Sequence, residues 1–294
     1  MILVDPNKPV YRGNTHTHTQ NSDGRKSFDE ALDIYAALGH DFLVVTDHWK
    51  IGPETRRGKM LVMSGIEYDF LDVPNQALHV VGILPGGADP GLDREKDNRD
   101  YNYAIRRINE VGGAAVLAHP HWSLNTLDVM KNVGDVVGAE AYNAVSGLPF
   151  GPDRAVSTAQ LDVAAANGRL FRFLCGDDTH YYLSEPGSGF TMVQADECTP
   201  EGIIAALKRG SFYCTQGPLV HAASYDPEAR VFSVDCSPAD MVVFYTDAPW
   251  APARCVAEKG MTHAEYHAVD RDHYVRCEVI DASGKRAWIS PVKA

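Results

Sequence analysis

The chain has 294 residues, of which 45% are hydrophobic and 22% are charged, and its formal net charge is −12. This composition predicts a globular protein with ample apolar material for a core, and the length fits one α/β barrel with a small appendage. The negative charge argues against nucleic acid and anionic membranes as partners, because both require basic patches. A small anionic substrate is compatible with it, since bound metal cations reverse the local field.

The sequence shows neither a secretory signal nor a membrane span. The apolar residues 2–4 are followed at once by Asp5 and Pro6, which leaves a run too short for a signal core. No apolar run approaches the ~20 residues of a membrane helix. The six cysteines are scattered without a Cys-x-x-Cys pair, a pattern typical of reduced thiols. These features predict a cytoplasmic location.

Strand-like and helical patterns alternate from the start of the chain to about residue 215. Residues 27–30 form a capping box, and apolar residues follow at helical spacing until Gly39, which predicts the first helix. Strands are predicted next over residues 42–46, 61–66 and 78–84. The second helix is predicted over 101–111, where apolar residues recur in phase before Gly112.

The alternation continues with strands predicted over 114–118 and 137–142, a helix over 154–167, strands over 171–175 and 190–194, and a helix over 199–209. This order predicts a parallel sheet, open or closed into a barrel. After Gln216 the pattern changes to short strand-like runs over residues 231–234, 241–245 and 274–280. We therefore predict an α/β barrel domain over residues 1–218 and a small antiparallel, β-sandwich-like appendage over residues 219–294.

Metal-competent side chains follow the predicted strands of the first domain. The stretch NTHTHTQNSDG contains His16, His18 and Asp23, and later strands lead into Asp47-His48, Glu67, His119-Pro120-His121 and Asp177 to His180. Any one of these groups is as well explained by a cap or a solvated loop. Because the carboxyl ends of parallel strands share one face, we expect all of them to converge. Imidazole and carboxylate groups bind Zn²⁺, Mn²⁺ and Fe²⁺, so the pattern predicts a metal centre.

The chain contains six segments that together resemble the pattern of the PHP (polymerase and histidinol phosphatase) superfamily. In chain order they are HTHTQNSDG, VTDH, SGIE, HVVG, LAHP and GDDTH. The resemblance covers most of residues 10–217 and implies a distorted (β/α)7 barrel with two or three divalent ions. Carried over by position, it implies His16, His18 and Asp178 for the first metal, His79 and His119 for the second, with Glu67 bridging the two, and Asp23, His48 and His180 for a third. The segment 210–218 and the β appendage resemble the branch around the carbaryl-type hydrolases.

Such a centre suits hydrolysis of a small-molecule phosphate ester, either a monoester or a cyclic or linear phosphodiester. Metal coordination lowers the pKa of water to about 7, and a hydroxide shared by the two metals that Glu67 joins would attack phosphorus in line. A carbamate or carboxyl ester hydrolase could use the same centre. Lys or Arg side chains in the pocket would favour the phosphoesterase, and an apolar pocket would favour the alternative. A metal-stabilised binding protein is a further reading, and a proofreading nuclease is opposed by the acidic charge.

Five further side chains are candidates for contact with the substrate or for proton transfer. His121 is a candidate proton donor to the leaving group, and Asp177 is a candidate for orienting a ligand imidazole. Arg56 and Arg57, with Lys59 beside them, are candidates for binding a second phosphate, and Arg154 is a similar candidate. Each is also explained by a packed or solvated position. The sequence leaves open the choice among Mn, Fe and Zn, the oligomeric state and the role of the appendage.

Overall fold

The computed structural model describes residues 1–70, 77–151 and 153–294. The first part of the chain forms β1 (Ile2–Val4), β2 (Val10–Asn14), α1 (Phe28–Ala37), β3 (Phe42–Val45), β4 (Thr55–Arg57), β5 (Met60–Phe70), β6 (Leu78–Leu84), η1 (Pro85–Gly87), α2 (Arg94–Asp97), α3 (Tyr101–Glu110), β7 (Ala114–Leu117), α4 (Leu127–Asn132), β8 (Gly138–Asn143), η2 (Val145–Gly147), α5 (Thr158–Ala166), β9 (Phe173–Gly176), β10 (Phe190–Gln194), α6 (Pro200–Arg209) and β11 (Phe212–Thr215). The remainder forms β12 (Val220–Asp226), β13 (Val231–Ala239), β14 (Met241–Tyr245), η3 (Pro252–Arg254), β15 (Cys255–Val256), β16 (Met261–His267), β17 (Tyr274–Ile280) and β18 (Arg286–Lys293).

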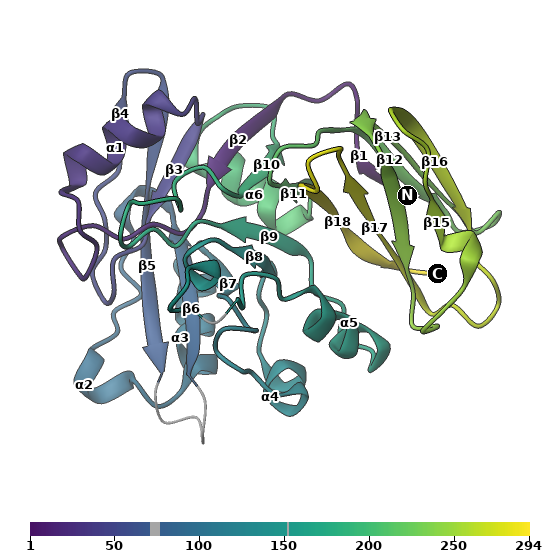
Figure 1. The fold of residues 1–294 in the computed structure, drawn as a ribbon. Helices are drawn as coiled ribbons and strands as arrows, with labels where there is room; N and C mark the ends of the chain where they lie inside the picture. Colours follow the sequence, from purple (N-terminus) through teal and green to yellow (C-terminus); the bar gives the residue numbers. More distant parts are fainter. Residues whose placement is uncertain (71–76, 152) are drawn as a thin grey trace.

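A large mixed sheet runs through the molecule in the strand order β15-β14-β17-β18-β11-β10-β2-β3-β5-β6-β7-β8-β9, with β4 beside β5 (Figure 1). Strands β2, β3 and β5 are parallel, as are β7, β8 and β9, whereas β6 runs antiparallel to both of its neighbours. Thr191 of β10 hydrogen-bonds to the backbone N–H and C=O of Cys175 in β9, at 3.1 Å each, which brings these two strands side by side. The predicted α/β class is confirmed as a mixed sheet with helices, and the closed barrel stays a prediction.

Helices α1 and α6 begin and end close to where their capping residues predicted. Ser27 and Glu30 form the capping box of α1. Thr199 accepts the N–H of Gly202 at 3.1 Å to start α6, and Gly210 ends it in the left-handed conformation at φ 79°. The predicted helix over 154–167 was wrong at its start, because α5 begins at Thr158. The residues before it run along β8, where Ala155 C=O accepts the N–H of Asn143 at 2.9 Å.

Strand β5 is longer than the sequence predicted. The prediction ended the strand at residue 66, before Glu67, but β5 continues to Phe70 and pairs with β6 along its whole second half. In this ladder Glu67 lies opposite Val81, and Asp69 lies opposite His79. The polar residues interrupt the apolar pattern without ending the strand, because they face a buried site.

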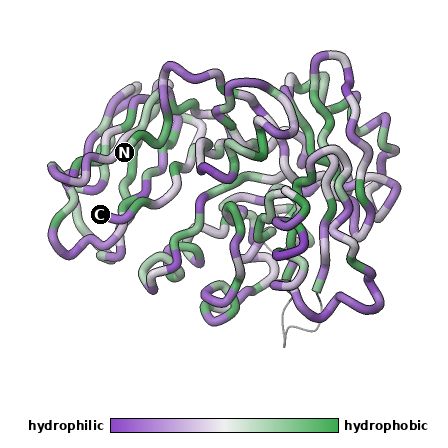
Figure 2. Tube along the Cα trace, turned by 180° about the vertical axis from the view of Figure 1, so that it is seen from behind, coloured by the Kyte–Doolittle hydropathy of each residue, from purple (hydrophilic) through white to green (hydrophobic). Residues whose placement is uncertain are grey.

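The C-terminal part is antiparallel, as predicted, and forms two packed sheets. Strands β14, β17 and β18 extend the large sheet, while β12, β13 and β16 join β1 in a second sheet with the order β1-β12-β13-β16. Their facing side chains form a core that includes Phe232, Phe244 and Tyr266. Hydrophobic residues concentrate along the inner strands, and hydrophilic residues concentrate in the connecting loops (Figure 2). Both chain ends lie in this part (Figure 1).

Polar and aromatic contacts join the C-terminal strands to the rest of the molecule. Arg276 of β17 forms a two-pronged ion pair with Asp162 of α5, with nitrogen–oxygen distances of 2.6 and 2.7 Å. Trp288 of β18 stacks on Tyr142 of β8 at a centroid distance of 5.8 Å. The two parts therefore share a core as well as a sheet. Across the described residues, the helices are too short or too polar to span a membrane.

Candidate metal centre

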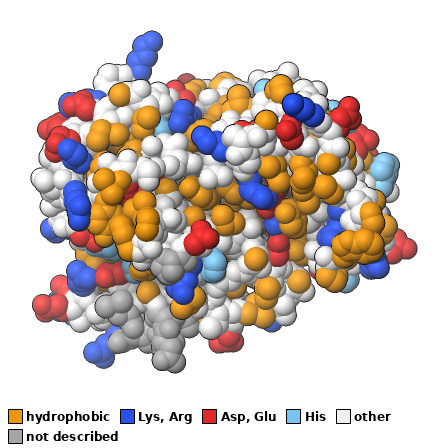
Figure 3. All heavy atoms as spheres, viewed as in Figure 1, with side chains coloured by type: hydrophobic (Ala, Val, Ile, Leu, Met, Phe, Trp, Pro, Cys, Tyr) orange, Lys and Arg blue, Asp and Glu red, His pale blue; other side chains and the backbone are white. Residues whose placement is uncertain are grey.

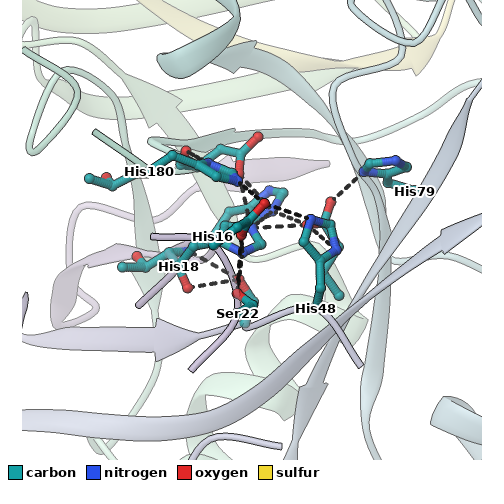
Figure 4. A network of polar contacts seen from close by, with 12 residues as sticks. His16, His18, Ser22, His48, His79 and His180 are labelled. Atoms are coloured by element: carbon teal, nitrogen blue, oxygen red, sulfur yellow. Dashed lines mark hydrogen bonds and ion pairs between the residues drawn. The ribbon is translucent and has the colours of Figure 1, made fainter. Parts of the chain in front are cut away.

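Nine His, Asp and Glu side chains meet at one end of the strands in the large sheet. They come from β5, β6 and the segments that follow β2, β3, β7 and β9. They fall into three groups whose ligand atoms lie within 4.8 Å of one another: His16, His18, Glu67 and Asp178; Glu67, His79 and His119; and His18, Asp23, His48 and His180. Figure 4 shows His16, His18, His48 and His180 turned toward one another, with His79 to one side. The structure thus brings together every residue that the motif resemblance implied as a ligand.

The first group surrounds a common point with four ligand atoms. The Nε2 atoms of His16 and His18 lie 3.2 Å apart. Asp178 Oδ1 lies 3.2 Å from the first and 3.1 Å from the second. Glu67 Oε2 completes the group at 2.9 Å from His18 Nε2 and 3.3 Å from His16 Nε2.

The carboxylate of Glu67 joins the first group to the second. Its other oxygen, Oε1, lies 2.9 Å from His79 Nδ1 and 3.3 Å from His119 Nε2. One carboxylate with an oxygen in each of two ligand groups has the arrangement of a bridging ligand.

The third group is the most open to solvent, because Asp23 is more than half exposed. Asp23 Oδ2 lies 3.4 Å from His180 Nε2 and 3.8 Å from His48 Nε2, and Asp23 Oδ1 lies 3.4 Å from His18 Nδ1. His18 therefore contributes one ring nitrogen to the first group and the other to the third.

The buried polar atoms of this centre fit a divalent cation better than they fit one another. Asp178 Oδ1 and His48 Nδ1 are buried, and neither has a hydrogen-bond partner among the described residues. Buried polar atoms rarely stay unsatisfied in folded proteins. A cation would accept the facing lone pairs of the His16 and His18 nitrogens together, whereas a hydrogen bond between them would need a proton on one of them.

In this centre, the pKa of each imidazole and carboxylate depends strongly on the charges of its neighbours. Burial alone lowers the pKa of His16, but the carboxylates of Asp178 and Glu67 raise it well above its usual value. Burial alone raises the pKa of Asp178, but the imidazoles, His16 first, bring it well below its usual value. The same balance lowers the pKa of Glu67. The carboxylates of Asp178 and Glu67 therefore favour positive charge in this centre, which is the charge that a bound cation would supply.

Backbone strain accompanies two of the ligand positions. His119 has φ 25° and Asp178 has φ 51°, a region that residues with a Cβ rarely adopt. Each such residue costs about 1–3 kcal/mol and persists when its surroundings fix it. The backbone N–H of His119 is fixed by Glu140, and that of Asp178 donates to the C=O of His16 at 2.8 Å.

Glu140 supports the ligands from behind, although it was not among the site residues selected from the sequence. Its Oε1 accepts a hydrogen bond from His16 Nδ1 at 2.9 Å, and its Oε2 accepts the backbone N–H of His119 at 2.9 Å. A proton on His16 Nδ1 leaves the Nε2 lone pair facing the other ligands. Gly176 makes room for this carboxylate, because a Cβ there would collide with Glu140 Oε1. The signal available in the sequence was a glutamate inside the strand predicted over residues 137–142.

Asp177 lies next to a ligand but faces away from the imidazoles. Its carboxylate accepts the N–H of Gly187 at 2.6 Å, the N–H of Gly189 at 3.0 Å and the hydroxyl of Tyr35 at 2.9 Å. Burial raises the pKa of Asp177 to about 7. These contacts hold the loop after β9, and the orienting role predicted for Asp177 at a ligand imidazole is filled by Glu140, which hydrogen-bonds His16.

The four other candidates lie outside the centre. His121 Nδ1 contacts the C=O of Val156 at 2.8 Å. Arg154 reaches the C=O of Trp122 at 3.5 Å. Arg57 pairs with Asp33 of α1 at 2.6 Å. Arg56 contacts backbone oxygens at 3.4 Å. The arginine pair belongs to β4.

A cavity of about 310 Å³ opens above the centre. Seven of the nine ligand candidates form its floor, and its walls are formed by Trp122, Val145, Phe150, Gly151 and Tyr181. Lys and Arg do not occur among the described residues that line it. On the face shown in Figure 3, Lys and Arg side chains are scattered among acidic and apolar ones.

No family model and no curated protein matches this sequence. Among solved structures, the fold is similar to that of a two-domain protein from Bacteroides vulgatus described as containing a PHP-like metal-dependent phosphoesterase. The two chains are 16% identical, the TM-score is 0.53, and the match covers 98% of this chain and 96% of that one. An amidohydrolase from Chromobacterium violaceum matches with 16% identity and a TM-score of 0.40, over 59% of this chain and 89% of its own.

A protein from Bifidobacterium adolescentis that is described as a metal-dependent phosphoesterase matches with 14% identity and a TM-score of 0.40, over the same shares of the two chains. The likeness to the Bacteroides vulgatus protein shows that the two chains share a fold, and the predicted resemblance is confirmed at the level of fold. The similarity to the carbaryl-type branch stays a prediction.

Proposed function

We propose that this protein is a metal-dependent hydrolase that cleaves a small-molecule phosphate ester. The observation that carries the proposal is the centre itself: nine ligand candidates in three groups, of which the first and second share Glu67 and the first and third share His18. Three cations at the floor of a small cavity would bind a phosphate through its oxygens, in place of Lys or Arg. The similar fold of the Bacteroides vulgatus protein supports the proposal.

The residues present would hold two or three divalent ions of Mn, Fe or Zn. When bound, such ions act as Lewis acids and lower the pKa of water to about 7. Glu140 would orient His16 and fix the backbone of His119, so that both imidazoles are preorganised. The aromatic side chains of Trp122, Phe150 and Tyr181 in the cavity wall would exclude solvent from the reacting ester. The proposal also includes a closed (β/α)7 barrel, a cytoplasmic location and a small anionic substrate.

A carbamate or carboxyl ester hydrolase is the second candidate, and the composition of the cavity favours it. Trp122, Val145, Phe150 and Tyr181 form an apolar wall, and the described lining residues include neither Lys nor Arg. A neutral ester would find the same floor and would need no cationic side chain.

The test is hydrolysis of a mixed panel by protein reconstituted with Mn²⁺. The panel contains phosphate monoesters, cyclic and linear phosphodiesters, aryl carbamates and carboxyl esters. His18→Ala should reduce turnover at least about 100-fold, because His18 serves two ligand groups. His221→Ala, a change at an exposed histidine of β12, is the matched control and should keep wild-type turnover.

The metal content of each protein is measured in parallel. Turnover of phosphate esters that is lost in His18→Ala would support the proposal, and turnover of carbamates or carboxyl esters alone would move it to the second candidate. Metal-loaded protein that is inactive on the whole panel would contradict both.

A further inference from the structure

One wall of the cavity is aromatic, and it touches the metal centre at both ends. The Trp122 ring lies 4.9 Å from the His119 ring and 5.7 Å from the His79 ring, edge to face in both cases. At the other end, the Tyr181 ring lies 6.4 Å from the His180 ring. The aromatic side chains of this wall therefore lie directly beside the ligand imidazoles.

Phe150 completes this wall and is poorly covered by the protein. Its ring meets Tyr181 edge to face at 4.8 Å, yet 60% of Phe150 is exposed. Trp122 is also 38% exposed. Large apolar side chains that line a cavity and stay exposed lose unfavourable contact with water when a ligand covers them.

The loop that carries Tyr181 is held rigidly by one buried carboxylate. Glu185 is 1% exposed, and its two oxygens accept four consecutive backbone N–H groups, those of residues 181–184, at 2.7–3.1 Å. The guanidinium of Arg25 lies over the Tyr181 ring at 4.6 Å from its centroid. A wall that is ordered before binding loses little conformational entropy when the ligand arrives.

The shape and charge of the cavity restrict what this wall can bind. A volume of about 310 Å³ lies at the small end of the range for ligand pockets. The metal-competent atoms of the floor would bind the reacting ester group, so the aromatic wall would contact the rest of the substrate. Aromatic side chains bind flat apolar groups by stacked or edge-to-face contact, and such pairs contribute beyond simple area burial.

We propose that the substrate is an ester of an aromatic alcohol, with its ring held against the aromatic wall formed by Trp122, Phe150 and Tyr181. The ester group lies over Glu67 and Asp178, and the aromatic ring is on the leaving side. This inference rests on the proposed function, because it assigns a substrate class to the same metal centre. It applies equally to phosphate, carbamate and carboxyl esters, since it concerns the part of the substrate that does not react.

The first experiment measures binding without turnover. Phenylphosphonate and methylphosphonate are titrated by calorimetry into Mn²⁺-loaded protein, because neither compound has an ester bond to break. We expect phenylphosphonate to bind at least tenfold more tightly than methylphosphonate. Phe150→Ala should reduce this ratio to threefold or less, whereas Phe150→Tyr should keep it. Trp250→Ala removes a 76% exposed tryptophan from the C-terminal part and is the matched control.

The second experiment compares kcat/KM for aryl and alkyl members of three ester pairs: phenyl and ethyl phosphate, phenyl and ethyl methylcarbamate, and phenyl and ethyl acetate. A preference for the aryl member that Phe150→Ala lowers at least fivefold, with metal content unchanged, supports the inference.

Two negative results have different meanings. Metal-dependent hydrolysis without an aryl preference beyond the intrinsic reactivity of the esters, or an equal loss on both members in Phe150→Ala, overturns the inference and leaves the hydrolase in place. Inactivity on all three pairs, together with no binding of either phosphonate, overturns the proposed hydrolase and the inference together.

Discussion

At the scale of single residues, Glu67 is the residue on which the centre depends most. Its Oε2 lies within 3.3 Å of nitrogens of His16, His18 and His48, and its Oε1 lies within 3.3 Å of nitrogens of His79 and His119. No other described carboxylate contacts as many imidazoles. Its bridging role was implied by the motif resemblance, whereas the supporting role of Glu140 could be found only from the structure.

Replacing Glu140 with Gln should weaken metal binding without unfolding the chain. An amide offers one acceptor, whereas His16 Nδ1 and the backbone N–H of His119 need two. We expect the Mn²⁺ dissociation constant to rise by about 10–100-fold, as for other changes behind a metal ligand. Competition with a fluorescent chelator measures it. Glu265→Gln changes an exposed glutamate of β16 and should leave the constant unchanged; equal affinities in the two variants would refute the role given to Glu140.

His40 should make the folded state sensitive to mild acid. It is buried against the rings of Tyr35 and Phe190, and burial together with the charge of Arg12 lowers its pKa to about 3. The unfolded chain binds a proton near pH 6.5 and the folded chain does not, so stability falls as the pH falls from 6.5 toward 3. His40→Leu should remove this component.

The measurement is urea unfolding of both proteins at several pH values. Between pH 6.5 and 4.5 the wild type should lose up to about 2.7 kcal/mol more than His40→Leu, from 1.36 kcal/mol per unit of pKa shift. Parallel pH profiles for the two proteins would show that His40 does not titrate in this way.

At the scale of elements, the sequence predicted those with local signals and missed those without them. Caps and terminal glycines placed α1, α3 and α6 within one or two residues. Strands β12 and β16 were missed because buried and exposed residues alternate along them, which leaves no apolar run. Strand β5 was cut short because its second half carries the polar groups of the site. Local patterns could not reveal that these polar residues face a buried centre.

The contact between α5 and β17 should be important for stability. Arg276 is 1% exposed and pairs with Asp162 and with Glu278 at 2.6 Å. Arg276→Met would leave the buried Glu278 and the partly buried Asp162 without this partner, which should lower the free energy of unfolding by about 3 kcal/mol. Urea unfolding measures the loss.

The control for this prediction is an exposed ion pair of similar chemistry. Lys26 and Glu30 lie 3.0 Å apart at the start of α1, and Lys26→Met should change stability by less than about 0.5 kcal/mol. A loss of under 1 kcal/mol in Arg276→Met would mean that the pair contributes little to holding α5 against the C-terminal strands.

At the scale of the whole molecule, the two parts of the chain share their core. Trp288 of β18 and Cys214 of β11 lie in the same buried cluster as residues of α3, β6 and β8. Strand β1, from the start of the chain, pairs with β12. Sequence patterns located the change from α/β to antiparallel structure, but they could not reveal this shared packing, which depends on contacts between distant residues. The boundary at residue 218 stays a prediction.

This shared core predicts that the chain unfolds as one unit. Circular dichroism and calorimetry of the full protein should give a single transition with matching midpoints. A fragment of residues 1–218 should lack a cooperative transition, because it would expose the surface that Trp288 covers. Two separate transitions in the full chain, or a well-folded fragment, would indicate that the parts are independent.

The pairing of β5 with β6 also determines how this sequence can change over evolutionary time. Glu67 and His79 reach the centre through a ladder in which Asp69 lies opposite His79. Inserting or deleting one residue within either strand would turn one of these side chains to the opposite face of the sheet. Substitutions elsewhere leave this alignment intact. A lineage can therefore replace most of its residues while it keeps the lengths of these two strands, and 16% identity with a protein of the same fold over 98% of the chain is the kind of divergence that this constraint permits.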